Sequence, residues 1–178
     1  AFDKAGNYTY ATQEVTVNYH PQWTWTHGSI YDSDPNNDND RWDNPANWSP
    51  YGVPPAEAVV NIGTDTVNSS FIPQQTFYGL NIGNGGGLYA ATVNIAVGST
   101  MNWTGGSFTG TLNIPAGASA NFSGSDKLLG QSSVVNNHGT VTWASSGVVQ
   151  GYQSVTFNNF AEGLLKITAD GVVFANYY

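Results

Sequence analysis

From Val59 onward the chain alternates apolar and polar residues in short runs, and this pattern predicts β-strands. The runs are separated by turns rich in Gly, Ser and Thr, and no window sustains the 3.6-residue period of a helix. One phrase recurs: an apolar residue, then Asn, then Gly two to five residues later, as in Val60-Asn61-Ile62-Gly63. The sequence therefore predicts an all-β protein built from repeats.

The spacing of the phrase predicts a β-solenoid. Most copies are about twenty residues apart, and each interval holds three short apolar runs, which fits one coil of three strands. Residues 57–178 then form about five or six stacked coils. The interval from Asn81 to Asn94 is shorter, and the Gly-rich stretch 83–90 within it predicts a tight corner or a shortened coil.

The repeated Asn predicts a ladder of side-chain hydrogen bonds. Equivalent positions in stacked coils lie about 4.8 Å apart, so their amides can bond to one another along the stack. The alternative is that Asn is only a common turn residue in an Asn-rich chain. Trp103, Phe122 and Trp143 also occupy equivalent positions, which predicts an internal aromatic stack. The predicted ladder consists of Asn61, Asn81, Asn94, Asn113, Asn136 and Asn158.

The chain divides into three segments. Residues 1–20 alternate from Tyr8 to Tyr19 and predict one extended strand. It pairs with its own solenoid, or it completes a sheet in a neighbouring subunit by strand addition, or it is a trimmed piece of a longer polypeptide. Residues 21–56 are rich in Trp and Asp and predict a cap over the first coil, because an open solenoid end is a sheet edge that recruits other chains.

Two interpretations are open for the tryptophans of this cap. Large aromatic side chains suit its core, where they would be buried. If exposed, the same rings would stack on the apolar faces of sugars and form a carbohydrate-binding surface. The residues concerned are Trp23, Trp25, Trp42 and Trp48.

An Asp/Asn run in the cap segment is similar to the calcium loop of EF-hand and dockerin proteins. Its acidic and amide residues occupy positions 1, 3, 5, 7, 9 and 12 of such a twelve-residue loop. Position 6 is Asn37 in place of Gly, position 12 is Asp in place of Glu, and no helices are predicted beside the loop. The run binds calcium or is a solvated acidic turn. The proposed ligands are Asp32, Asp34, Asn36, Asp38, Asp40 and Asp43.

The stretch Trp42-Asp43-Asn44-Pro45-Ala46-Asn47-Trp48-Ser49, followed by Gly52 and Pro54, resembles the W-x-x-x-x-N-W-x-x-G-x-x-P entry to β-helical repeats. That entry occurs in large secreted bacterial proteins, including autotransporter-type passengers and surface-anchored adhesins. The resemblance covers roughly residues 40–175. It implies a right-handed solenoid and an adhesive or structural role at the cell surface, and it carries over no catalytic motif.

The composition excludes several classes of function. The 178 residues carry a net charge of −8 and include only four Lys and Arg, so nucleic acid is an unsuitable partner. No apolar run is long enough to span a membrane. No set of Ser, His and acid residues is recognisable, and there is no Cys, so we expect no enzyme.

We therefore expect an extracellular structural or adhesive surface protein that self-assembles by strand addition or end-to-end stacking, as a filament subunit or a segment of a larger assembly. The alternative is a carbohydrate-binding module of a secreted polysaccharide-active or biofilm protein.

Overall fold

The computed structural model describes residues 19–27, 40–144, 147–169 and, for the backbone, 174–177. Within these ranges a single 15-stranded sheet winds into a β-solenoid of about five turns, which confirms the predicted fold class. The elements are β1 (Gln22–Trp25), the 3₁₀ turn η1 (Pro45–Asn47), β2 (Trp48–Ser49), β3 (Val59–Ile62), β4 (Asp65–Ser69), β5 (Gln75–Ile82), β6 (Gly86–Trp103), β7 (Gly106–Ile114), β8 (Ser119–Phe122), β9 (Lys127–Leu129), β10 (Val134–Asn137), β11 (Thr140–Trp143), β12 (Val149–Tyr152), β13 (Thr156–Asn159), β14 (Leu164–Ile167) and β15 (Phe174–Tyr177).

The solenoid has three faces, because the long strands β5, β6 and β7 bend around its corners and pair with different neighbours along their length. Face A consists of β1, β3, the last parts of β5 and β6, β8, β11 and β14. Face B consists of β4, the first parts of β6 and β7, β9, β12 and β15. Face C consists of the first part of β5, the middle of β6, the end of β7, β10 and β13.

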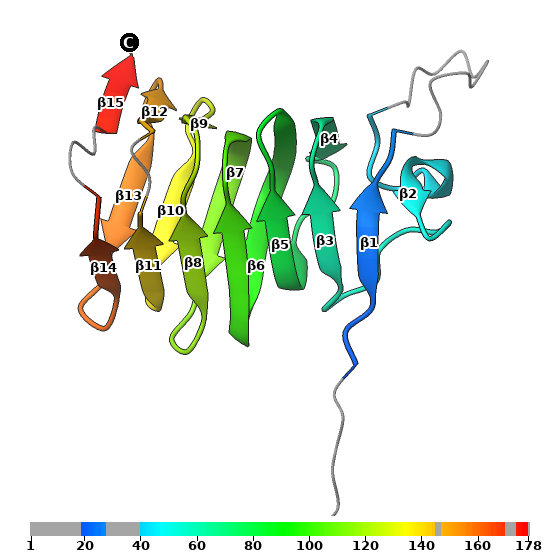
Figure 1. The fold of residues 1–178 in the computed structure, drawn as a ribbon, viewed down its shortest axis with the longest axis horizontal. Helices are drawn as coiled ribbons and strands as arrows, with labels where there is room; N and C mark the ends of the chain where they lie inside the picture. Colours follow the sequence, from blue (N-terminus) through cyan, green and yellow to red (C-terminus); the bar gives the residue numbers. More distant parts are fainter. Residues whose placement is uncertain (1–18, 28–39, 145–146, 170–173, 178) are drawn as a thin grey trace, which may run out of the picture.

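The strands within each face are parallel and in register. Figure 1 shows the arrows of face A side by side, from β1 at one end of the stack to β14 at the other. The exception is β2, which pairs antiparallel with β1. Consecutive coils thus place equivalent residues directly beside one another.

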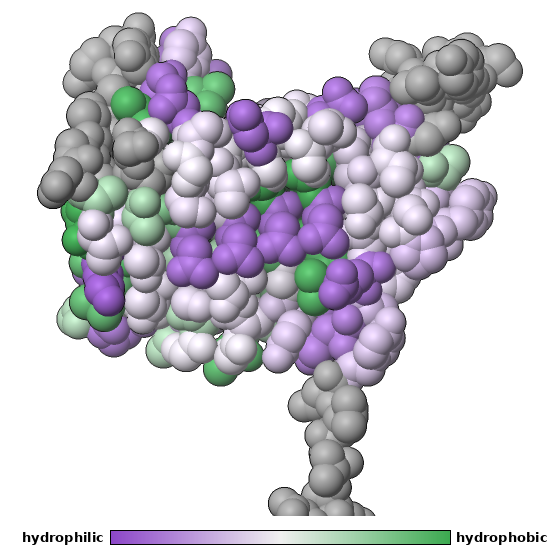
Figure 2. All heavy atoms as spheres, viewed as in Figure 1, coloured by the Kyte–Doolittle hydropathy of each residue, from purple (hydrophilic) through white to green (hydrophobic). Residues whose placement is uncertain are grey.

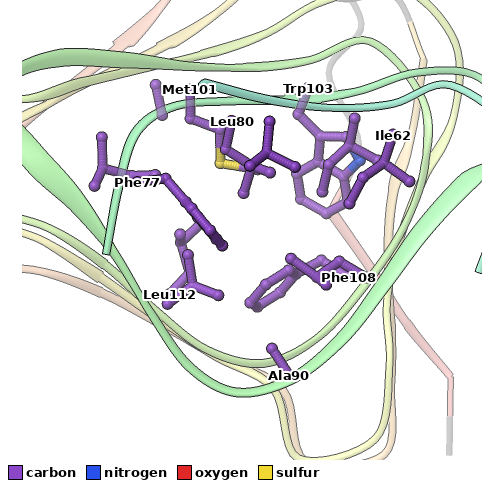
Figure 3. Close-up of a cluster of buried hydrophobic side chains, with 14 of the residues drawn as sticks. Ile62, Phe77, Leu80, Ala90, Met101, Trp103, Phe108 and Leu112 are labelled. Atoms are coloured by element: carbon purple, nitrogen blue, oxygen red, sulfur yellow. The ribbon is translucent and has the colours of Figure 1, made fainter. Parts of the chain in front are cut away.

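The core follows from the alternation along each strand. In β3, Val60 and Ile62 point inward and are fully buried, while Asn61 between them points outward. Figure 3 shows side chains from successive coils meeting inside the ribbon, including Phe77, Met101 and Trp103. The predicted aromatic stack lies in this interior: the ring centroid of Phe122 is 5.2 Å from that of Trp103 and 6.0 Å from that of Trp143, in edge-to-face contacts.

Candidate functional site

Asparagine ladders run along the outside of two faces. On face A, the amide of Asn81 donates to Asn61, that of Asn102 to Asn81, and that of Asn121 to Asn102, at 2.7, 2.9 and 3.0 Å. We call these four residues ladder A. Figure 2 shows a row of hydrophilic side chains across the strands of this face. The strand pairing thus turns a repeated sequence residue into a continuous hydrogen-bonded row.

A second row lies on face C. Asn113 donates to Asn94, Asn136 to Asn113, and Asn158 to Asn136, at 2.8 to 2.9 Å. We call these four residues ladder C. All six predicted residues make ladder hydrogen bonds, but in two rows instead of one, because Asn61 and Asn81 belong to a different face from the other four.

The short interval between Asn81 and Asn94 now has a physical reason. It is the path from face A, past the Gly-rich corner and face B, to face C, and no coil is shortened there. Asn102 and Asn121, which continue ladder A, were not among the predicted residues. Their signal was present: each lies between two buried apolar residues, as Asn61 and Asn81 do.

The described tryptophans of the cap segment are mostly buried at the β1 end of the stack. The rings of Trp25, Trp42 and Trp48 are 3%, 2% and 3% exposed and contact one another edge to face, with centroids 4.6 to 5.1 Å apart along the cluster. Trp48 donates its indole N–H to the carbonyl of Trp42 at 2.8 Å. Rings buried in this way offer no face to a sugar. Trp23 is half-buried and packs against the core.

Most of the predicted calcium loop lies outside the described residues, namely Asp32, Asp34, Asn36 and Asp38. Asp40 is exposed. Both carboxylate oxygens of Asp43 accept hydrogen bonds from Arg41, at 2.9 and 2.7 Å, so this residue is already paired and does not fit the role of a free bidentate ligand. Calcium binding stays a prediction for the residues before Asp43. Titration with terbium would test it, because terbium bound in the loop would show luminescence sensitised by Trp42. The absence of such luminescence would refute the prediction.

Several acidic groups in the described structure are engaged in separate local contacts. His27 contacts Asp65, and His138 contacts Glu162. Asp126 accepts the N–H of Val148 at 2.9 Å. Within the described ranges, no three His, Cys, Asp or Glu residues cluster as metal ligands would.

The sequence predicted nothing for Lys127 beyond its charge, but the structure buries it. It is 1% exposed, and its ammonium donates to the carbonyls of Ser123 and Ser125 at 2.6 and 2.7 Å. Burial lowers the pKa of Lys127, while the nearby Asp126 acts in the opposite direction. Along β9, Lys127 and Leu129 are two residues apart and both point inward. This alternation was the sequence pattern that could have predicted the burial of Lys127. Its contacts stabilise a corner between faces A and B.

The last described coil is less covered than the coils before it. On face C, the inward residues Val93, Leu112 and Val135 are fully buried, whereas their equivalent Phe157 is only partly buried. On face A, Trp103, Phe122 and Trp143 are followed by Ile167, which is 55% exposed. Within the described chain, β13 and β14 each pair with one neighbour, β10 and β11. Among the described residues, this coil therefore has strand edges without a neighbour and inward apolar side chains that are only partly covered.

Comparison of the chain with known protein families, with characterised proteins and with solved structures finds no match. In the described residues, no helix is both long and apolar enough to cross a membrane.

Proposed function

We propose that this chain is a structural unit of an extracellular, cell-surface assembly, and that a second copy joins it through the last coil of the solenoid. The observation that supports this proposal is the exposure of the coil formed by β13 and β14. Leu164 is 54% exposed and Ile167 is 55% exposed on a strand that has one open edge. Exposed apolar edge strands pair with other chains unless something covers them.

A second copy suits this surface because a solenoid coil is covered by another coil throughout the rest of the stack. In a two-fold contact, β14 of one copy lies antiparallel to β14 of the other, so the two edges satisfy each other's backbone groups and cover each other's apolar side chains. The coil edge also carries few charges: Lys166 is the one charged side chain on β14. Its open backbone groups supply the hydrogen bonds of strand addition.

The two ends of the stack differ, and this difference bears on the geometry of assembly. The β1 end is covered on face A by β2 and by the buried Trp25 and Trp48, while β14 has an open edge. Contact between two last coils is isologous and gives a closed dimer, whereas contact between unlike ends leaves free ends and gives filaments. The cover over β1 favours the contact between two last coils. Filaments could also form by addition of the predicted N-terminal strand to a second copy, and that strand lies outside the described residues except for Tyr19 and His20.

The test is sedimentation velocity at increasing protein concentration, combined with negative-stain electron microscopy. The double variant Leu164→Lys and Ile167→Lys places charges on the open edge and should abolish self-association. The matched control, Tyr89→Lys and Tyr152→Lys, changes two exposed aromatic residues on face B and should leave self-association intact.

Each outcome has a defined meaning. Concentration-dependent dimers that are lost only in the edge variant support the proposal. Fibres that disappear when residues 1–18 are deleted, but persist in the edge variant, assign assembly to the N-terminal strand and contradict it. A monomer at every concentration also contradicts it.

A further inference from the structure

One asparagine outside both ladders, Asn84, is followed directly by glycine, and this is the only Asn-Gly pair in the sequence. The pair forms the middle of the β-turn Gly83–Gly86, at the corner between faces A and B. The backbone N–H of Gly86 closes the turn by donating to the carbonyl of Gly83 at 3.1 Å. Gly85 has a backbone φ of +98°, as the third residue of a type II turn does. Asn84 therefore lies in a tight turn between strands, not in a strand ladder.

The groups of this pair that can react with each other are accessible. Asn84 and Gly85 are both exposed. Among the described residues, neither the side-chain amide of Asn84 nor the backbone N–H of Gly85 has a hydrogen-bond partner. A Cβ added at Gly85 would have only the carbonyl oxygen of Gly63 nearby, at 3.9 Å, and glycine has the widest choice of backbone angles. The nitrogen of Gly85 is thus free to approach the side-chain carbonyl carbon of Asn84.

From this arrangement we infer that Asn84 is a site of spontaneous deamidation in the folded protein. The nitrogen of Gly85 loses its proton to solvent base and attacks Cγ of Asn84. The new C–N bond closes a succinimide ring, the bond from Cγ to Nδ2 breaks, and the side-chain nitrogen leaves as ammonia. Water then opens the ring at Cγ, which gives aspartate, or at the main-chain carbonyl, which gives isoaspartate. The net change is the gain of water and the loss of ammonia, without an oxidant or a reductant.

The ladder asparagine closest in sequence lacks these properties. Asn81 donates its amide to Asn61 at 2.7 Å and accepts from Asn102 at 2.9 Å, so both polar atoms of its side chain are engaged. It lies within β5, and the next residue, Ile82, is β-branched and crowds the attacking nitrogen. The structure therefore favours deamidation at Asn84 over deamidation at Asn81.

The two products should affect this corner differently, because the ends of the turn are tightly packed. A Cβ added at Gly86 would lie 2.3 Å from the carbonyl oxygen of Ile62, and one added at Gly106 would lie 2.7 Å from that of Gly83. Isoaspartate lengthens the main chain of the turn by a methylene carbon, which these contacts cannot accommodate unless the corner opens. Aspartate leaves the main chain unchanged and adds a carboxylate to the shallow groove that this side chain shares with Asp126.

The test is peptide mapping by mass spectrometry after prolonged incubation at mildly alkaline pH, with the protein folded in buffer or unfolded in guanidinium chloride. Chymotryptic cleavage after Leu80 and Leu88 gives a peptide that contains both Asn81 and Asn84. Fragmentation by electron transfer locates the conversion and distinguishes aspartate from isoaspartate. In the folded protein, Asn84 should convert at a rate within about tenfold of that in the unfolded chain, because no cooperative opening is needed, while Asn81 should stay intact.

Two variants serve as controls. Asn84→Gln keeps an amide but would have to close a larger ring, so conversion should be lost, and an unchanged unfolding temperature would show that this variant is folded. Asn84→Asp reproduces the aspartate product and, when freshly prepared, should unfold at the temperature of the unmodified wild type. Fractions of the incubated wild type that are enriched in isoaspartate should unfold at a lower temperature.

Three results would overturn the inference. These are the absence of conversion at Asn84 in the folded protein, whether or not the unfolded chain converts, equal conversion of Asn81 and Asn84 in the folded protein, and conversion of this peptide that persists in Asn84→Gln. The edge variant Leu164→Lys and Ile167→Lys should convert as the wild type does, so the result does not depend on the proposed assembly through the last coil.

Discussion

Asn102 lies inside ladder A and takes part in two of its hydrogen bonds. Its amide donates to Asn81 at 2.9 Å, and its carbonyl oxygen accepts from Asn121 at 3.0 Å. Asn121 is the last member of ladder A, since Thr142 occupies the equivalent place in β11. The two residues face outward on neighbouring strands, so they differ mainly in the number of ladder bonds that they make.

We expect Asn102→Ala to lower the free energy of unfolding by about 1–2 kcal/mol and Asn121→Ala by about half as much, because each lost hydrogen bond costs roughly 1 kcal/mol. Urea unfolding followed by circular dichroism would measure both. Equal losses would show that the ladder bonds add little beyond the contacts of a single Asn.

Gly98 and Gly106 share a backbone φ of +80° but have different surroundings. A Cβ added at Gly98 would meet nothing within 4 Å, whereas one at Gly106 would lie 2.0 Å from the carbonyl oxygen of Gly86. Gly106 thus permits the close stacking of the corner between faces A and B, while Gly98 supplies only the left-handed conformation.

Substitution by Ala should separate these two requirements. Gly98→Ala should cost about 1–2 kcal/mol, the penalty for a side chain in the left-handed region. Gly106→Ala should cost several kcal/mol, since the backbone of two coils must also move apart. Thermal unfolding of both variants would measure the difference, and similar losses would contradict the steric argument.

At the scale of elements, the segment 40–49 is attached to the solenoid by a few specific contacts. Trp42 donates its backbone N–H to Asn68 at 2.9 Å, and Arg41 both pairs with Asp43 and stacks over Phe71. The hydrogen bond from Arg41 holds the pKa of Asp43 below its ordinary value of 3.8, while partial burial acts against it. The pair of Arg41 and Asp43 lies within this segment, and the charge of Asp43 helps to hold the guanidinium of Arg41 over Phe71.

A carboxyl whose pKa is lower in the folded state stabilises the protein above its unfolded pKa. This contribution is lost as the pH falls through the folded pKa. We expect the Asp43→Asn variant to have a lower free energy of unfolding than the wild type near pH 6, and a smaller difference from it near pH 2. Urea unfolding at both pH values, followed by tryptophan fluorescence, would measure the difference, and an effect independent of pH would exclude a role for the charge.

At the scale of the whole molecule, stability should vary along the solenoid axis. Each coil contacts only its neighbours, so a coil with one neighbour opens more readily than a coil with two. The inner coils have fully buried residues such as Leu112 and Ala120, while their last equivalents, Phe157 and Leu165, are only partly buried. The described coil formed by β13 and β14 is thus the expected starting point of unfolding.

Hydrogen exchange can test this gradient. At low protein concentration, the hydrogen-bonded amides of β13 and β14 should exchange about tenfold faster, or more, than those of β10 and β11. At high concentration the difference should shrink if a second copy covers the last coil. Uniform protection along the stack at low concentration would contradict the gradient.

Several features were determined by the sequence itself. Alternation with a period of two in β3, β8 and β11 fixed the strand type and the inward residues, because successive side chains of a strand point to opposite sides. The recurrence of three such runs about every twenty residues fixed the solenoid, since one coil cannot bury its apolar side alone.

The tertiary structure decided how the repeats align. Ladder neighbours are separated by 19 to 23 residues, so spacing along the chain cannot say which Asn stacks on which. Backbone hydrogen bonds between coils set that register, and they divided one apparent ladder into two. Packing between residues far apart in the chain, such as Trp42 against Phe77, buried Trp25, Trp42 and Trp48. Contacts of this kind join residues that are far apart in the sequence, and no local pattern encodes them.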